Sequence, residues 1–76
     1  MKLDNESLPD FLKGKRRLLK ITQLELAEKA GVGLRFIRDM EQGKTTLRMD
    51  KVNQVLKLFG HELKPIPINR DKLLNK

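Results

Sequence analysis

Apolar residues recur at helical spacing in four segments of the chain, and polar or glycine residues mark where each segment begins and ends. The first segment opens with "SLPD", in which Ser7 can cap a helix and Asp10 takes the acidic position of a capping box. The second opens with "TQLE", a capping box formed by Thr22 and Glu25, and Gly31 is suited to end it in a left-handed conformation. The pattern therefore predicts an all-α domain of four or five helices.

One stripe of each predicted helix is apolar, and the stripes together form the expected core. The alanines of the second helix are small, which predicts close approach by another helix. The expected core residues are Leu8, Phe11, Leu12, Leu18, Leu19, Leu26, Ala27, Ala30, Ile37, Met40, Val52, Val55, Leu56 and Phe59, with Met49 as further filler and with Val32 and Leu47 as anchors of the links between helices.

The stretch "GVGLRFIRDMEQGK" contains the turn after the second helix and the third helix itself. The turn, "GVG", has three residues, and two of them are glycines. Two helices connected in this way form a helix-turn-helix, whose second helix enters the major groove of DNA. Ile37 and Met40 point to one side of that helix, and Arg35 and Arg38 point to the other. Because an arginine can donate two hydrogen bonds to O6 and N7 of guanine, this pair predicts contacts with base edges; contacts with phosphates alone are the alternative.

The charge of the chain points to a polyanionic partner. Lys+Arg 17 against Asp+Glu 10 gives a net charge of +7 and a pI ≈ 10.1 in a chain of 76 residues. Such an excess on a small surface attracts nucleic acid, although it is equally compatible with a charge that serves solubility. The basic run "KGKRRLLK" contains Lys15 and Arg17, which either follow the DNA backbone as phosphate contacts or belong to a solvated face.

The composition disfavours several other classes of protein. The chain has no cysteine, no apolar run near the roughly 20 residues of a membrane span, and acids and a proline where a signal peptide would be apolar. It has no metal-binding spacing, nucleophile–base set or glycine-rich phosphate loop, and its single histidine, His61, follows a predicted helix end. We therefore expect a cytoplasmic protein that is not an enzyme and binds no metal, cofactor or membrane.

The C-terminal region, residues 61–76, differs in character from the helical domain at residues 7–60. In "HELKPIPI", Pro65 and Pro67 lack an N–H group on the same edge of an extended chain, which can then pair only through its other edge. Because no earlier segment reads as a strand, we predict a short β-strand that pairs with its copy across the two-fold axis of a homodimer. The predicted strand residues are Leu63, Lys64, Ile66 and Ile68, and a disordered or polyproline-like tail is the alternative.

The segment "TQLELAEKAGVGLRFIRDMEQGK" resembles the helix-turn-helix of the Cro/repressor-like (Xre) family. The resemblance rests on Thr22-Gln23, Leu26-Ala27, Gly31, Ile37 and Glu41-Gln42-Gly43-Lys44. The wording "GVGLRFIRDMEQGK", followed by a fourth helix and "HEL", is similar to HipB-type antitoxins. Those proteins repress their own operons and act beside a HipA- or HipT-type kinase toxin.

The resemblance implies roles for individual residues. Base contacts are expected from Gly33, Leu34, Arg35, Arg38 and Asp39, and phosphate contacts from Gln23, Phe36, Gln42 and Lys44, together with Lys15 and Arg17 of the basic run. Arg16 and Glu41 match an ion pair of the family, which would make Arg16 structural and not a phosphate contact.

Three positions depart from the family pattern. Gly33 replaces a common capping serine or threonine, and Leu34 and Phe36 occupy positions that are often polar. Leu34 either touches a thymine methyl group or packs inside, and Phe36 either packs on the sugar–phosphate wall or at the rim of the core. Asp39 would suit a DNA-facing position if it accepts from cytosine N4 or orients Arg35.

The sequence thus predicts a homodimeric repressor that binds a palindromic operator in double-stranded DNA. The resemblance further implies an antitoxin that regulates its own toxin–antitoxin operon and has a kinase-type toxin as partner. The alternative is a helix-turn-helix interaction module that neutralises a toxin without reading DNA, because a fold alone does not establish a function.

Overall fold

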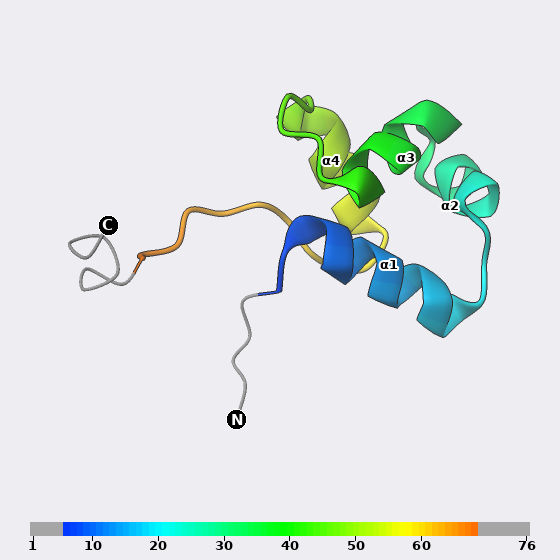
Figure 1. Ribbon diagram of the computed structural model, residues 1–76, viewed down its shortest axis with the longest axis horizontal. Coiled ribbons are helices and arrows are strands. Elements are labelled where there is room, and N and C mark those ends of the chain that lie inside the picture. The colour runs from blue at the N-terminus through cyan, green and yellow to red at the C-terminus, as the bar shows by residue number, and fades with distance from the viewer. Residues whose placement is uncertain (1–5, 69–76) are drawn as a thin grey trace.

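The computed structural model describes residues 6–68 of the chain, which contain four α-helices (Figure 1). The bounds of the helices are α1 Leu8–Leu19, α2 Gln23–Ala30, α3 Leu34–Gln42 and α4 Met49–Lys57. The all-α prediction is therefore confirmed with the lower of the two expected helix counts. Within residues 6–68, no helix has the length and apolar character needed to cross a lipid bilayer.

The predicted caps determine where the first two helices begin. Ser7 Oγ accepts the N–H of Asp10 at 3.2 Å. Thr22 Oγ1 accepts the N–H of Glu25 at 3.0 Å, and the Glu25 carboxylate accepts the N–H of Thr22 at 2.8 Å. Each bond satisfies a backbone donor that has no partner within its own helix, so the local sequence specifies both starts.

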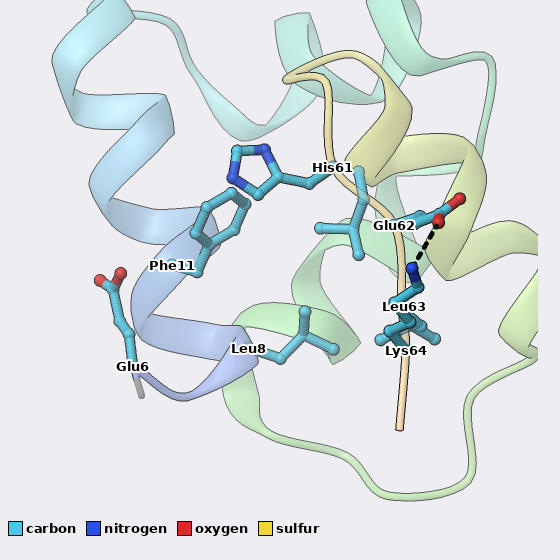
Figure 2. Close-up of a pocket in the computed structure, with 8 residues that line it drawn as sticks. Glu6, Leu8, Phe11, His61, Glu62, Leu63 and Lys64 are labelled. Atoms are coloured by element: carbon cyan, nitrogen blue, oxygen red, sulfur yellow. Dashed lines mark ion pairs between the residues drawn. The ribbon is translucent and has the colours of Figure 1, made fainter. Parts of the chain in front are cut away.

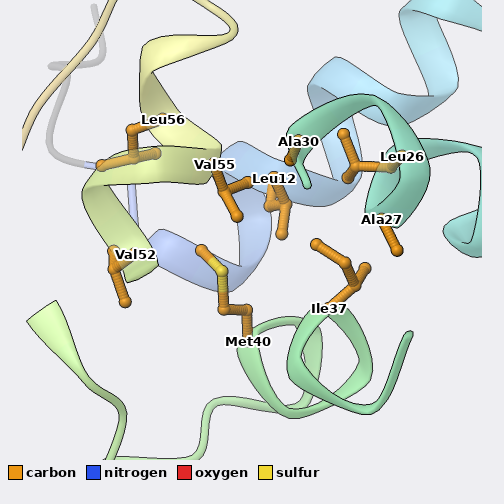
Figure 3. Packing of buried hydrophobic residues seen from close by; sticks show 9 residues of the cluster. All are labelled: Leu12, Leu26, Ala27, Ala30, Ile37, Met40, Val52, Val55 and Leu56. Carbon is orange, nitrogen blue, oxygen red and sulfur yellow. The ribbon is translucent and has the colours of Figure 1, made fainter. Parts of the chain in front are cut away.

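The core lies where all four helices meet (Figure 3). Ile37 and Met40 of α3 point toward Leu12 of α1 and Val55 of α4, and all four side chains are fully or almost fully buried. The two alanines of α2 are buried as well, in agreement with the expected close approach of a neighbouring helix. The buried apolar residues are Leu12, Leu26, Ala27, Ala30, Ile37, Met40, Val52, Val55 and Leu56, and the expected residues that are partly buried against them are Leu8, Phe11, Val32, Leu47 and Phe59.

Three residues expected in the core are exposed. Leu18, Leu19 and Met49 keep 74%, 53% and 67% of their surface accessible to solvent. In α1 the position one turn after Leu12 is occupied by the charged Arg16, and Leu12 is the only buried residue of that helix. Met49 is the first residue of α4, before the stripe that faces the core begins. The helical spacing of these residues was compatible with burial. The structure instead leaves Leu18 and Leu19 exposed at the end of α1 and Met49 exposed at the start of α4.

The predicted C-terminal β-strand is not present, because residues 61–68 have no regular secondary structure and no strand occurs among residues 6–68. A strand requires a hydrogen-bonded neighbour, and this part of the chain provides none. The segment lies against the body only at its start, where the centroid of the His61 ring is 4.7 Å from that of the Phe11 ring (Figure 2). There, Leu63 N–H also donates to Asn53 Oδ1 at 2.8 Å. It then runs away from the side of the molecule that carries α2 (Figure 1).

The residue that ends α1 is conformationally strained. Lys20 has φ 56° and ψ 45°, in the left-handed region, where a side chain with a Cβ costs about 1–2 kcal/mol. We therefore expect Lys20→Gly to raise the free energy of unfolding by about 1 kcal/mol, as measured by urea denaturation. Lys57→Gly is the control, since it removes the same charge from a helical position and should lower stability by about 0.5–1 kcal/mol. Equal losses in both variants would contradict the assigned strain.

Candidate nucleic-acid interface

The chain between α2 and α3 is a tight turn of three residues, 31–33. Gly31 ends α2 with φ 75°, and its N–H and that of Val32 both donate to Ala27 O, at 2.9 and 3.0 Å. Val32 is partly buried against the core and anchors the turn. Gly33 then occupies the N-cap position of α3 and makes no side-chain hydrogen bond to it. The start of α3 is therefore held by contacts with other parts of the chain and not by a cap of its own.

Helix α3 separates its side chains into a buried and an exposed face. Ile37 is 0% and Met40 is 1% exposed, whereas Arg35, Arg38 and Gln42 lie in solvent. Burial of the first pair therefore turns both guanidinium groups outward. A guanidinium carries five N–H donors in a planar fork, which suits the acceptors of guanine and of phosphate.

Glu41 lies beneath this face and is the one buried charged residue of the described chain. Its Oε2 accepts from Arg16 Nε at 2.7 Å, and its Oε1 accepts from Arg16 Nη2 and from Gln23 Nε2, both at 3.0 Å. Arg16 Nη1 also donates to Ile21 O at 3.2 Å. The carboxylate thus joins the start of α2 and the end of α1 to α3, and the structure brings together the two residues of the expected ion pair.

The hydrogen bonds outweigh the effect of burial on the acidity of Glu41. Burial alone raises the pKa of a carboxyl group, but the donors on Arg16 and Gln23 favour the charged form, so the pKa of Glu41 is lowered from its usual value. The carboxylate in turn raises the pKa of Arg16. Both groups therefore stay ionised at neutral pH.

The same geometry changes the expected role of Gln23. Its side-chain amide donates to Glu41, which leaves it partly buried at the first position of α2. The resemblance implied a phosphate contact for Gln23, which stays a prediction, and the structure adds a bond to Glu41 that braces α3. In the free protein, the side chain of Gln23 contacts Glu41 of α3.

Asp39 and Lys44 form a second ion pair, at the far end of α3. Lys44 Nζ is 3.5 Å from Asp39 Oδ2, with 52% of the Lys44 side chain and 19% of the Asp39 side chain exposed. Asp39 therefore pairs with the lysine that follows α3, whereas the sequence suggested a contact with cytosine N4 or with Arg35. The pair joins Lys44, which follows the end of α3, to that helix, whose last residue Gln42 is exposed.

The remaining expected contact residues differ in exposure. Leu34 and Phe36 are partly buried and pack against the core, and a contact of either with DNA stays a prediction. Lys15 lies with its Nζ 5.5 Å from the centroid of the Phe11 ring, and Arg17 is exposed. The structure thus gathers Arg35, Arg38, Gln42 and Lys44 on or beside α3.

Sequence reasoning missed one residue that shapes this site. Gln54 of α4 donates through Nε2 to Ala30 O at 2.9 Å and to Gly31 O at 3.0 Å, the carbonyl groups that end α2 and begin the turn. A polar residue between buried Val52 and Val55 is ordinary on the outer face of a helix, so its spacing gave no signal of this contact.

Comparison with known proteins agrees with this geometry. The Helix-turn-helix (HTH_3) family matches residues 12–64, and the chain belongs to that family. The chain is also 53% identical over 45 residues to the "Uncharacterized HTH-type transcriptional regulator y4mF" of Sinorhizobium fredii (strain NBRC 101917 / NGR234), a match that covers 59% of each protein. No solved structure matches the chain.

We expect Glu41→Gln to lower the free energy of unfolding by about 3 kcal/mol, because it leaves the Arg16 guanidinium without its counter-ion in a partly buried site. Arg48→Ala is the matched control, since Arg48 and Asp50 form a pair of the same length, 2.7 Å, with 68% and 65% of their side chains exposed. Exposed pairs contribute about 0–1 kcal/mol. Urea denaturation of both variants measures the difference, and similar losses would contradict the structural role of Glu41.

The same pair makes stability depend on pH. Because the pKa of Glu41 in the folded chain lies below its usual value of 4.5, the stabilisation is complete above that pH and is lost as the pH falls through the folded-state pKa. Unfolding measured between pH 7 and pH 2 should therefore show a steeper acid loss in the wild-type protein than in Glu41→Gln. Asp50, whose pKa Arg48 lowers, contributes equally to both curves. Parallel curves would show that Glu41 is not preferentially ionised in the folded chain.

Proposed function

We propose that this protein is a transcriptional regulator that binds double-stranded DNA sequence-specifically through the exposed face of α3. The observation that carries the proposal is the burial of Ile37 and Met40, which leaves Arg35 and Arg38 in solvent on the second helix of a helix-turn-helix. That helix enters the major groove in proteins of this architecture, with its N-terminal residues on the base edges. Arg35 is the second residue of α3, and this position near the start of the helix supports a base contact.

The groups around α3 suit the phosphate backbone. Lys44 follows the helix end, Gln42 is exposed beside it, and the chain carries a net charge of +7. Phosphate contacts of this kind orient a protein on the duplex without reading its sequence, and each makes binding weaker as salt rises. In this proposal Arg35 and Arg38 provide discrimination, and Lys44 provides orientation.

The proposal includes a homodimer that represses transcription from a palindromic operator. Residues 61–68 extend away from the helices, and Ile66 and Ile68 keep 63% and 64% of their surface exposed in the single chain. A second copy that pairs with this segment would cover them and supply the neighbour that a strand requires. Two α3 helices would then contact half-sites about 34–36 Å apart, or a multiple of that spacing.

A finer proposal is that the operon under control is a toxin–antitoxin operon with a kinase-type toxin. It rests on the resemblance of "GVGLRFIRDMEQGK" and the following "HEL" to HipB-type antitoxins. An interaction module that neutralises a toxin without reading DNA is the competing function. The exposed pair Arg35 and Arg38 favours the DNA reader, because a module that contacts only protein has no need of a cationic face on α3.

The roles of Arg35 and Lys44 can be separated by their effects on affinity. A duplex selected from a randomised pool serves as the specific site, and a scrambled duplex serves as the non-specific one. Arg35→Ala should weaken binding to the selected duplex by about 1–3 kcal/mol and relax one base position, with little change on the scrambled duplex. Lys44→Ala should weaken both and make the salt slope shallower by about one.

Lys57→Ala is the control for removal of a positive charge away from α3, and fluorescence anisotropy over a salt series measures all three variants. If Arg35→Ala weakens both duplexes equally, Arg35 contacts only phosphate. If the wild-type protein shows no salt-sensitive binding to any duplex, the proposed function is wrong.

A further inference from the structure

The amide of Gln54 bridges two elements that meet at the turn of the helix-turn-helix. It reaches from α4 and donates to both Ala30 O and Gly31 O. The last carbonyl groups of an α-helix have no partner within the helix, so these are acceptors that another group must satisfy. Gln54, a side chain of a different helix, therefore supplies the donor for two carbonyl groups at the end of α2.

Apart from the backbone hydrogen bonds of Gly31 and Val32 to Ala27, the turn has few other means of support. Gly31 has φ 75°, and a Cβ at that position would lie 3.1 Å from Gln54 Nε2, so the amide packs closely on the backbone. Val32 is its one apolar anchor, and Gly33 provides no side-chain cap for α3. The two hydrogen bonds from Gln54 thus attach α4 to the chain at Gly31, four residues before Arg35.

We propose that Gln54 is a positioning residue for base recognition: its hydrogen bonds to Ala30 and Gly31 fix the turn against α4 and thereby set the place and angle at which the start of α3 presents Arg35. This inference rests on the proposed function. Base contacts tolerate less displacement than phosphate contacts, because a bidentate pair requires a set geometry whereas a flexible cation follows a phosphate. Loss of Gln54 should therefore reduce discrimination between sequences more than it reduces affinity for DNA in general.

Adjacent Asn53 provides a matched control. Its side chain accepts the N–H of Leu63, so it holds the C-terminal segment and not the turn. Asn53→Ala and Gln54→Met each remove one amide from the same helix, but only the second leaves the carbonyls of Ala30 and Gly31 without their donor. Gln54→Lys restores a donor through an ammonium group, which also suits the C-terminal end of α2.

The first measurement is the ratio of affinities for the selected and scrambled duplexes. Gln54→Met should lower that ratio about tenfold, as expected for loss of the hydrogen bonds that hold the turn, with the salt slope unchanged. Gln54→Lys should recover most of the ratio. Its added positive charge raises the affinity for both duplexes alike and therefore does not change their ratio. Asn53→Ala should leave the ratio within about twofold, and an equal loss in Asn53→Ala would assign the effect to general weakening of α4.

The second measurement, amide hydrogen exchange in the free protein, does not require DNA. Gln54→Met should accelerate exchange of the Gly31 and Val32 amides, which donate to Ala27 O, relative to the Leu26 amide, which donates to Thr22 O at the other end of α2. Exchange that stays at the wild-type rate would overturn the inference, as would an unchanged affinity ratio. If the wild-type protein prefers no duplex, the proposed function fails, and the exchange experiment still decides whether Gln54 holds the turn.

Discussion

The arrangement of the first three helices depends on one buried carboxylate. Glu41 accepts hydrogen bonds from Arg16 and Gln23, so a single side chain of α3 joins the end of α1 to the beginning of α2. A buried charge is expensive unless it is paired and fully hydrogen-bonded, and here both oxygens have donors. The geometry of the pair is therefore demanding, which makes it suited to fixing the orientation of α3 in a domain whose apolar core is small.

The rest of the site follows from that orientation. With Glu41 held on the inner side, Ile37 and Met40 pack against α1 and α4, and the arginines of α3 face outward. Lys44, paired with Asp39, lies at one end of the exposed face. Gln54 holds the other end through the turn. The exposed face of α3 is thus fixed from below by an ion pair and at its N-terminal end by an amide, while Arg35 and Arg38 lie in solvent.

The sequence allowed prediction of those features whose causes are local. Capping boxes, left-handed glycines and the helical spacing of apolar residues located the helices and most of the core. Leu18, Leu19 and Met49 were misplaced because spacing identifies a helix face but not how far along the helix the core extends. The strand predicted within residues 61–68 needs the same segment of a second subunit as its hydrogen-bonded neighbour, and a single chain does not contain that neighbour. Gln54 was missed because its partners are backbone atoms far away in sequence, which no side-chain pattern marks.

Base reading by α3 is the central claim, and guanine analogues test it directly. Replacing single guanines of the selected duplex by 7-deazaguanine removes the N7 acceptor and leaves Watson–Crick pairing intact. Because the arginine fork contacts O6 and N7 together, we expect binding to weaken at one or more guanines in each half-site, and the penalty at one of them to vanish in Arg35→Ala. If every substituted duplex binds as tightly as the unmodified one, α3 does not recognise guanine through these arginines.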